Sequence, residues 1–172
     1  MNNVISPART ALKWGVILGI ALIVYSLALY LTDSVGNSSL GFISFALSIA
    51  GLVLAMRDYR TLNGGYMSYG EGLSVGTLTS AVSGLLSAMF SVFYTTVIDT
   101  GAMTRMVERT REQLEDSGAS DDVVEQQLSI IEMFQSPGLS FAFGVIGSVI
   151  FGLLLSLVIS AIMRRNRANP FE

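Results

Sequence analysis

The chain has 172 residues, of which 51% are hydrophobic and only 13% are charged, about half the charged share of a soluble domain. It contains neither cysteine nor histidine, which excludes disulfides, thiolate chemistry and the commonest general base and metal ligand. With a net charge of −3, we expect no nucleic acid partner. We likewise expect no metal site, no cofactor and no enzymatic activity.

Four apolar stretches are each long enough to cross a membrane. A hydrocarbon core of about 30 Å needs roughly 20 residues of helix, and about 17 suffice. The stretches cover about residues 14–31, 40–56, 72–98 and 138–163, and none contains a charged residue. We therefore predict an all-α, four-helix transmembrane protein that forms one integral membrane domain over residues 1–172.

The first stretch has a second interpretation. Arg9 and Lys13 followed by an apolar run could be a signal peptide, with a cleavage motif near Ser26. The run continues to Leu31, however, which is longer than the usual core of a signal peptide. A membrane-spanning helix is therefore the favoured interpretation.

Basic residues are sorted across the predicted membrane. Seven of the ten fall in the amino-terminal tail, after the second stretch or after the fourth. The loops after the first and third stretches hold the other three, together with ten of the thirteen acids. Because basic residues near helix ends are retained in the cytoplasm, we expect both termini to be cytoplasmic and the loop from Asp99 to Ser136 to be external.

Small residues recur every four positions in the third and fourth stretches, which places them on one face of each helix. Helices in a membrane associate through such residues because their backbones can approach closely. We therefore predict that the third and fourth helices pack along these two ladders. Their helix-packing residues are Gly72, Gly76, Ser80 and Gly84 in the third stretch, and Gly144, Ser148, Gly152 and Ser156 in the fourth.

Two alternatives concern polar groups in the third stretch. Its hydroxyl residues could line a path for a solute, but serine and threonine in membrane helices mainly serve packing. Glu71 stands where the third helix begins, so its carboxylate can cap the positive end of the helix dipole. An ionisable residue at a membrane helix is also a candidate polar site, and Glu71 is the one we single out.

The external loop shows helical periodicity. We predict an amphipathic helical hairpin over about residues 101–135, with a turn near Gly118. Val124, Leu128 and Ile131 fall on one face of its second helix, which we expect to be buried against the first helix, the bilayer or a partner. We name these three residues as the candidate partner surface. The acids of this loop could be read as a metal site, but their spacing does not fit a calcium loop, and a solvated acidic face is the better interpretation.

The layout resembles a known bacterial family. Its features are Tyr69-Gly70-Glu71-Gly72 entering a glycine-spaced third helix, Phe93-Tyr94 and Ile98-Asp99 closing it, and an external hairpin before the last helix. They resemble the uncharacterised membrane family filed as domain of unknown function 4199, found mostly in Gram-negative Bacteroidota. The chain departs from that family at Thr100, where proline is expected. The resemblance implies an inner-membrane location with a periplasmic hairpin, and it supplies no catalytic residues.

Two functions follow as hypotheses. The first is a small non-enzymatic inner-membrane protein that assembles by helix packing, as a homo-oligomer or with another protein, and presents its periplasmic hairpin to a partner. The alternative is the subunit of an oligomeric small transporter or channel, since four helices rarely enclose a path alone. An intramembrane enzyme without histidine or cysteine would have to work through Glu71, Asp99 or hydroxyl residues, and is the least favoured interpretation.

Overall fold

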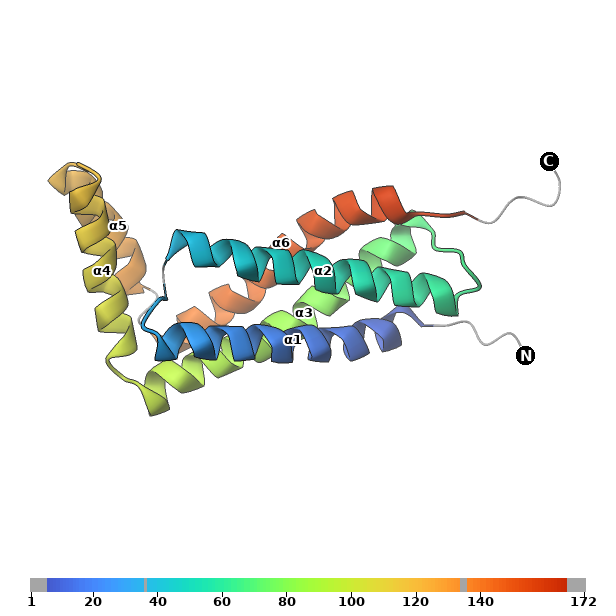
Figure 1. Cartoon of the computed structure of the whole chain (residues 1–172), viewed down its shortest axis with the longest axis horizontal. Helices are drawn as coiled ribbons and strands as arrows, with labels where there is room; N and C mark the ends of the chain where they lie inside the picture. The colour runs from blue at the N-terminus through green and yellow to red at the C-terminus, as the bar shows by residue number, and fades with distance from the viewer. Residues whose placement is uncertain (1–5, 36, 134–135, 167–172) are drawn as a thin grey trace.

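The computed structural model describes residues 6–35, 37–133 and 136–166. Four long helices form an elongated bundle, and two shorter helices lie crosswise at one end of it (Figure 1). The prediction of an all-α protein with four apolar membrane-length helices and a hairpin between the last two is confirmed. The elements are α1 (Pro7–Leu31), α2 (Ser38–Leu62), α3 (Tyr69–Phe93), the π-helical turn η1 (Tyr94–Ile98), α4 (Ala102–Asp116), α5 (Asp121–Met133) and α6 (Pro137–Met163).

Prolines, a capping asparagine and a turn glycine mark several of the helix ends. Pro7 and Pro137 occupy the first turns of α1 and α6, where a missing backbone N–H costs nothing. The side chain of Asn37 accepts a hydrogen bond from Ser39 N at the start of α2. Gly118 adopts a φ of 76° in the turn between α4 and α5, a conformation that favours glycine.

Helices α1 and α2 extend beyond the apolar stretches that predicted them. α1 begins at Pro7 and α2 continues to Leu62, so Lys13, Arg57 and Asp58 are all helical. Apolar composition marks the part of a helix that lies in hydrocarbon, whereas backbone hydrogen bonding continues into the charged flanks.

Helix α3 lies at the centre of the bundle, with α1 and α6 packed along it and α2 beside all three. A cluster of buried apolar side chains occupies the half of the bundle farther from the hairpin. Its buried side chains come from three helices: Leu52, Met56 and Tyr59 from α2, Val75 from α3 and Ile159 from α6.

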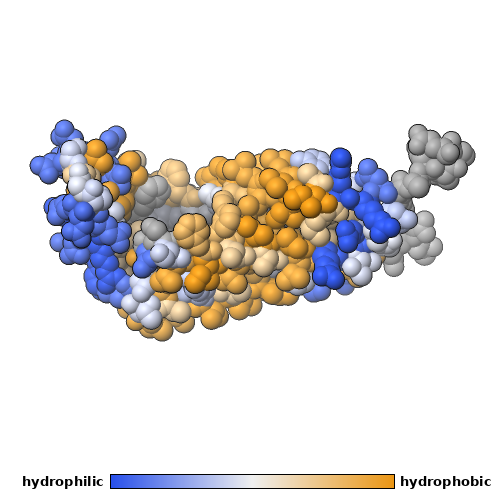
Figure 2. All heavy atoms as spheres, turned by 45° about the horizontal axis from the view of Figure 1, so that its top comes forward, coloured by the Kyte–Doolittle hydropathy of each residue, from blue (hydrophilic) through white to orange (hydrophobic). Residues whose placement is uncertain are grey.

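The outer surface of the bundle is apolar in its middle and polar at both ends (Figure 2). Large apolar side chains point outward along all four helices, among them Val24, Phe42, Ile150 and Val158. An exposed belt of this extent is unfavourable in water and favourable in lipid. The chain is therefore an integral membrane protein. The start of α1 and the end of α6 lie at one end of it and the hairpin lies at the other (Figure 1).

Candidate functional site

The two predicted ladders of small residues face each other between α3 and α6. Gly76 lies so close to Ser156 that a Cβ placed on this glycine would be 2.0 Å from Ser156 Oγ. A Cβ on Gly84 would be 1.7 Å from Ser148 Oγ, and one on Gly152 would be 2.0 Å from Ser80 Oγ. Only glycine therefore fits at these three positions while the helices keep their separation.

Each level of this α3–α6 contact joins one glycine to one small side chain. Both helices supply glycines, α3 at three levels and α6 at two, so that a side chain from either helix lies against the bare backbone of the other. The pairs in order from the end farther from the hairpin are Gly72 with Ser160, Gly76 with Ser156, Ser80 with Gly152, Gly84 with Ser148, and Ala88 with Gly144.

A second face of α3 receives α1. A Cβ on Gly15 would lie 2.6 Å from the Val82 Cβ, and one on Gly19 would lie 2.9 Å from the Leu86 Cδ1. Here a glycine of α1 accepts a large side chain of α3, in contrast to the small-residue contact with α6. Helix α3 is thus held on two faces by close backbone approach.

Glu71 caps α3. Its carboxylate accepts a hydrogen bond from Ser68 N at 2.7 Å, and Ser68 Oγ accepts one from Glu71 N at 3.3 Å, which completes a reciprocal capping box. The hydroxyl of Tyr59 donates to Glu71 Oε1 at 2.9 Å. The capping interpretation is therefore confirmed, and the same carboxylate also ties α3 to α2.

Other polar contacts tie the helices together at this end. Lys13 Nζ and Trp14 Nε1 of α1 both donate to Asp58 Oδ2 of α2, at 2.8 and 2.7 Å. Met67 and Arg165 form an antiparallel backbone bridge between the α2–α3 turn and the chain after α6. Asp58 is not recognisable from the sequence as a tie between helices, because a charge near a membrane boundary carries no signal of its partner.

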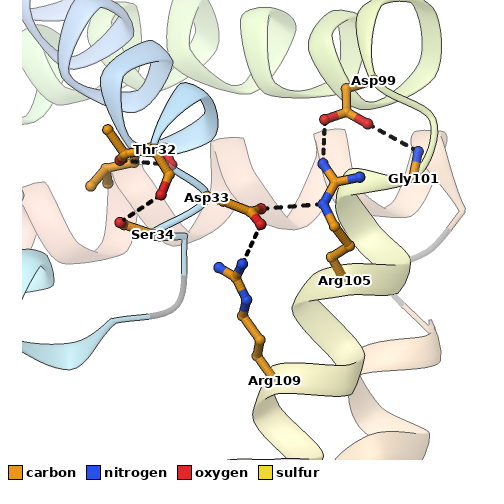
Figure 3. Close-up of polar contacts among 8 residues, drawn as sticks. Thr32, Asp33, Ser34, Asp99, Gly101, Arg105 and Arg109 are labelled. Atoms are coloured by element: carbon orange, nitrogen blue, oxygen red, sulfur yellow. Dashed lines mark hydrogen bonds and ion pairs between the residues drawn. The ribbon is translucent and has the colours of Figure 1, made fainter.

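At the opposite end, ion pairs fix the hairpin to the bundle (Figure 3). Arg105 of α4 donates from Nε to Asp33 Oδ1 at 3.2 Å, and its Nη2 donates to Asp99 Oδ2. Arg109, one turn farther along α4, donates to the other oxygen of Asp33. Asp33 follows α1 and Asp99 follows η1, so these pairs join α4 to two transmembrane helices.

The lowered pKa of Asp99 sets the pH response of its ion pair with Arg105. The hydrogen bond from Arg105 holds the pKa of the Asp99 carboxyl below its usual value, and its charge and the N–H groups of Gly101 and Ala102 act in the same direction. A lowered pKa gives stabilisation that is complete above the unfolded-state pKa and is lost only as the pH falls through the folded-state value. The Asp99–Arg105 ion pair is therefore lost only at acidic pH.

The predicted partner surface needs correction. Val124 and Leu128 are buried, and α4 is the helix that α5 packs against, so these two side chains form the interior of the hairpin. Ile131 is half-buried. Of the three expected occupants of this face, the first helix of the hairpin, α4, is the one present, so the assignment of Val124 and Leu128 to a surface open to a partner is wrong. The apolar side chains of α5 that do stay open are Val123, Ile130 and Met133.

Comparison with known families identifies the chain. It matches the family described as "Protein of unknown function (DUF4199)" over residues 13–165. The chain belongs to this family. The match covers both ladders, Glu71 and the whole hairpin, so the architecture above is that of a DUF4199 protein. No curated protein and no solved structure matches the chain. Family membership thus confirms the resemblance seen in the sequence and assigns no activity.

Proposed function

We propose that this DUF4199 protein is a non-enzymatic membrane protein that holds a rigid hairpin outside the bilayer for a partner protein. One observation carries the proposal: two arginines of α4 are bonded to Asp33 and Asp99 of the bundle, so the hairpin has a fixed orientation across its end (Figures 1 and 3). A loop with no binding role has no need of such a fixed orientation.

The charge of the hairpin favours a basic protein as that partner. Residues 101–133 contain eight acids and three arginines. Arg105 and Arg109 are directed to the bundle, so the acids, all of which are exposed, dominate the outward surface. Such a surface is repelled by anionic lipid and attracts a basic protein surface.

The partner can be tested in native membranes with a photo-crosslinking residue at Gln113, an exposed neutral position of α4. We expect a discrete protein adduct. Its yield should fall about tenfold when Glu112 and Asp116 are both changed to lysine, because reversing surface charges slows association by this order. Changing exposed Arg111 to glutamine should leave the adduct intact. Adducts to lipid alone, or a protein adduct that ignores the charge reversal, would contradict the proposal.

We also propose that the protein lies in the bacterial inner membrane with both termini cytoplasmic and the hairpin periplasmic. The basic flanks of the spans and the common end of α1 and α6 support this orientation. The chain has no native cysteine, so single cysteines are clean reporters. In intact spheroplasts an impermeant thiol reagent should label Ser117→Cys and should reach Asn166→Cys only after permeabilisation. Labelling in the reverse order would show the opposite topology.

The alternative function, a subunit of an oligomeric small transporter or channel, is favoured by a different observation. The bundle is not packed evenly: its half nearer the hairpin contains a cavity with serine hydroxyls in its wall. A binding site in that cavity is compatible with either function.

A further inference from the structure

The exposed surface of α5 is divided into an acidic sector and an uncharged one. Successive residues of an α-helix are about 100° apart around its axis. Val124 and Leu128 mark the sector of α5 that packs against α4. All four acids of α5 lie on one side of that sector, and no charged residue lies on the other. The acids are Asp121, Asp122, Glu125 and Glu132, and the uncharged face consists of Val123, Gln126, Gln127, Ile130 and Met133.

The uncharged face stays open in the structure. Val123 is 41% exposed, Ile130 50% and Met133 64%. Among the described residues, α4 is the one helix against which α5 packs extensively, so no other helix covers this face. An apolar face beside a charged one is the arrangement expected of a helix that lies in a membrane interface, with lipid on one side and water on the other.

The ion pairs at the base of the hairpin fix the direction of this face. Arg105 and Arg109 contact Asp33 at the end of α1, and Met106 lines a small pocket with the same aspartate, so this side of α4 is turned toward the bundle (Figure 3). Helix α5 runs antiparallel beside α4 (Figure 1). With Val124 and Leu128 against α4, the face of α5 that continues this side is the uncharged one, and the acids point away from the bundle. Figure 2 shows the same division: hydrophilic side chains cover the outer side of the hairpin, and apolar ones lie on the side toward the bundle.

The length of the bundle places the hairpin at the depth of the lipid headgroups. Helices α1, α2 and α3 have 25 residues each, and at 1.5 Å per residue each is about 37 Å long. A bilayer is about 40–45 Å thick with its headgroup layers. The turn between α4 and α5 also reaches past the side of the bundle, where lipid surrounds the apolar belt (Figure 1).

We propose that the uncharged face of α5 lies in the headgroup layer of the leaflet next to the hairpin, with Val123, Ile130 and Met133 directed toward the acyl chains. Lipid is the occupant because the face is turned toward the membrane, lies at headgroup depth and carries no charge. The acids on the other side of α5 remain in water. This lipid contact therefore does not depend on the basic partner proposed above, which would bind the acidic surface.

The contact is tested with nitroxide spin labels on single cysteines, since the chain has no native cysteine. Purified protein is reconstituted into phosphatidylcholine vesicles with no other protein present. The label on Ile130→Cys is compared with one on Ser129→Cys, a neighbouring exposed position in the acidic sector. At Ile130→Cys we expect more collisions with oxygen, which concentrates in lipid, and several-fold fewer collisions with a water-soluble nickel chelate.

Two results would overturn the proposal. Equal collision rates with the nickel chelate at both positions would show that α5 stands in water. Few collisions with either reagent at Ile130→Cys would show that protein, and not lipid, covers the face.

A second set of variants tests whether the apolar side chains hold the face in the lipid. With the label on Gln127→Cys, Ile130→Glu should raise the nickel collision rate several-fold, to that of the label on Ser129→Cys. Ser129→Glu, which adds the same charge on the acidic side, should leave the rate unchanged. No change with Ile130→Glu would contradict the proposal, and Val123→Glu on the same face gives the same test if Ile130→Glu does not fold. The adduct at Gln113 reports the protein partner separately, so the two proposals can fail independently.

Discussion

Replacing Gly84 with serine should destabilise the bundle, and replacing Ser148 with glycine in the same chain should restore it. A Cβ at position 84 would lie 1.7 Å from Ser148 Oγ and 2.4 Å from Ser148 Cβ, so α3 and α6 must separate to admit it. Overpacking of this kind costs about 1–3 kcal/mol. Serine is a better helix former than glycine by roughly 0.5 kcal/mol, which is too little to offset the clash. Thermal unfolding in detergent measures the net effect.

The double variant is the decisive control because it moves the glycine from one helix to the other. Ser80 with Gly152 already shows that this arrangement fits between the same two helices. We expect a coupling energy of about 1–3 kcal/mol between the two changes, whereas Leu85→Ile, at a lipid-facing position, should have little effect. Strictly additive effects of Gly84→Ser and Ser148→Gly would mean that the ladders are not in contact.

Changing Leu128 to aspartate should unfold the hairpin and leave the bundle intact. Leu128 is 4% exposed in the α4–α5 contact, so the change removes a buried apolar side chain and places a carboxylate there without a partner. The expected cost is about 3 kcal/mol or more, which two short helices cannot absorb. Hydrogen exchange in native membranes should show loss of protection in residues 102–133 and none in α3 or α6.

Glu125→Lys is the matched control because Glu125 lies between the buried residues Val124 and Leu128 in the chain and is itself exposed. It should leave exchange in both helices of the hairpin unchanged. The same protection in Leu128→Asp as in the parent chain would show that α5 does not bury this face against α4.

Local features of the sequence determined the elements of this protein. The four spans follow from the length of apolar runs, because hydrocarbon thickness sets a minimum helix length. The hairpin follows from helical periodicity around Gly118, and the cap of α3 follows from Ser68 and Glu71 three residues apart. These signals need only neighbours within a few positions in the chain.

The tertiary structure alone decided which elements meet. A four-residue spacing places small residues on one face of a helix but does not fix the partner or the register. The register is set by the volume of single side chains, because Gly76 faces Ser156 and Gly152 faces Ser80. Asp33 and Arg109 are 76 positions apart, and the sequence presents them only as charges on the same side of the membrane. The cavity in the bundle also depends on four helices at once, since residues of α1, α2, α3 and α6 line it. Contacts of this kind depend on how whole helices are rotated and placed against each other, which a local pattern does not encode.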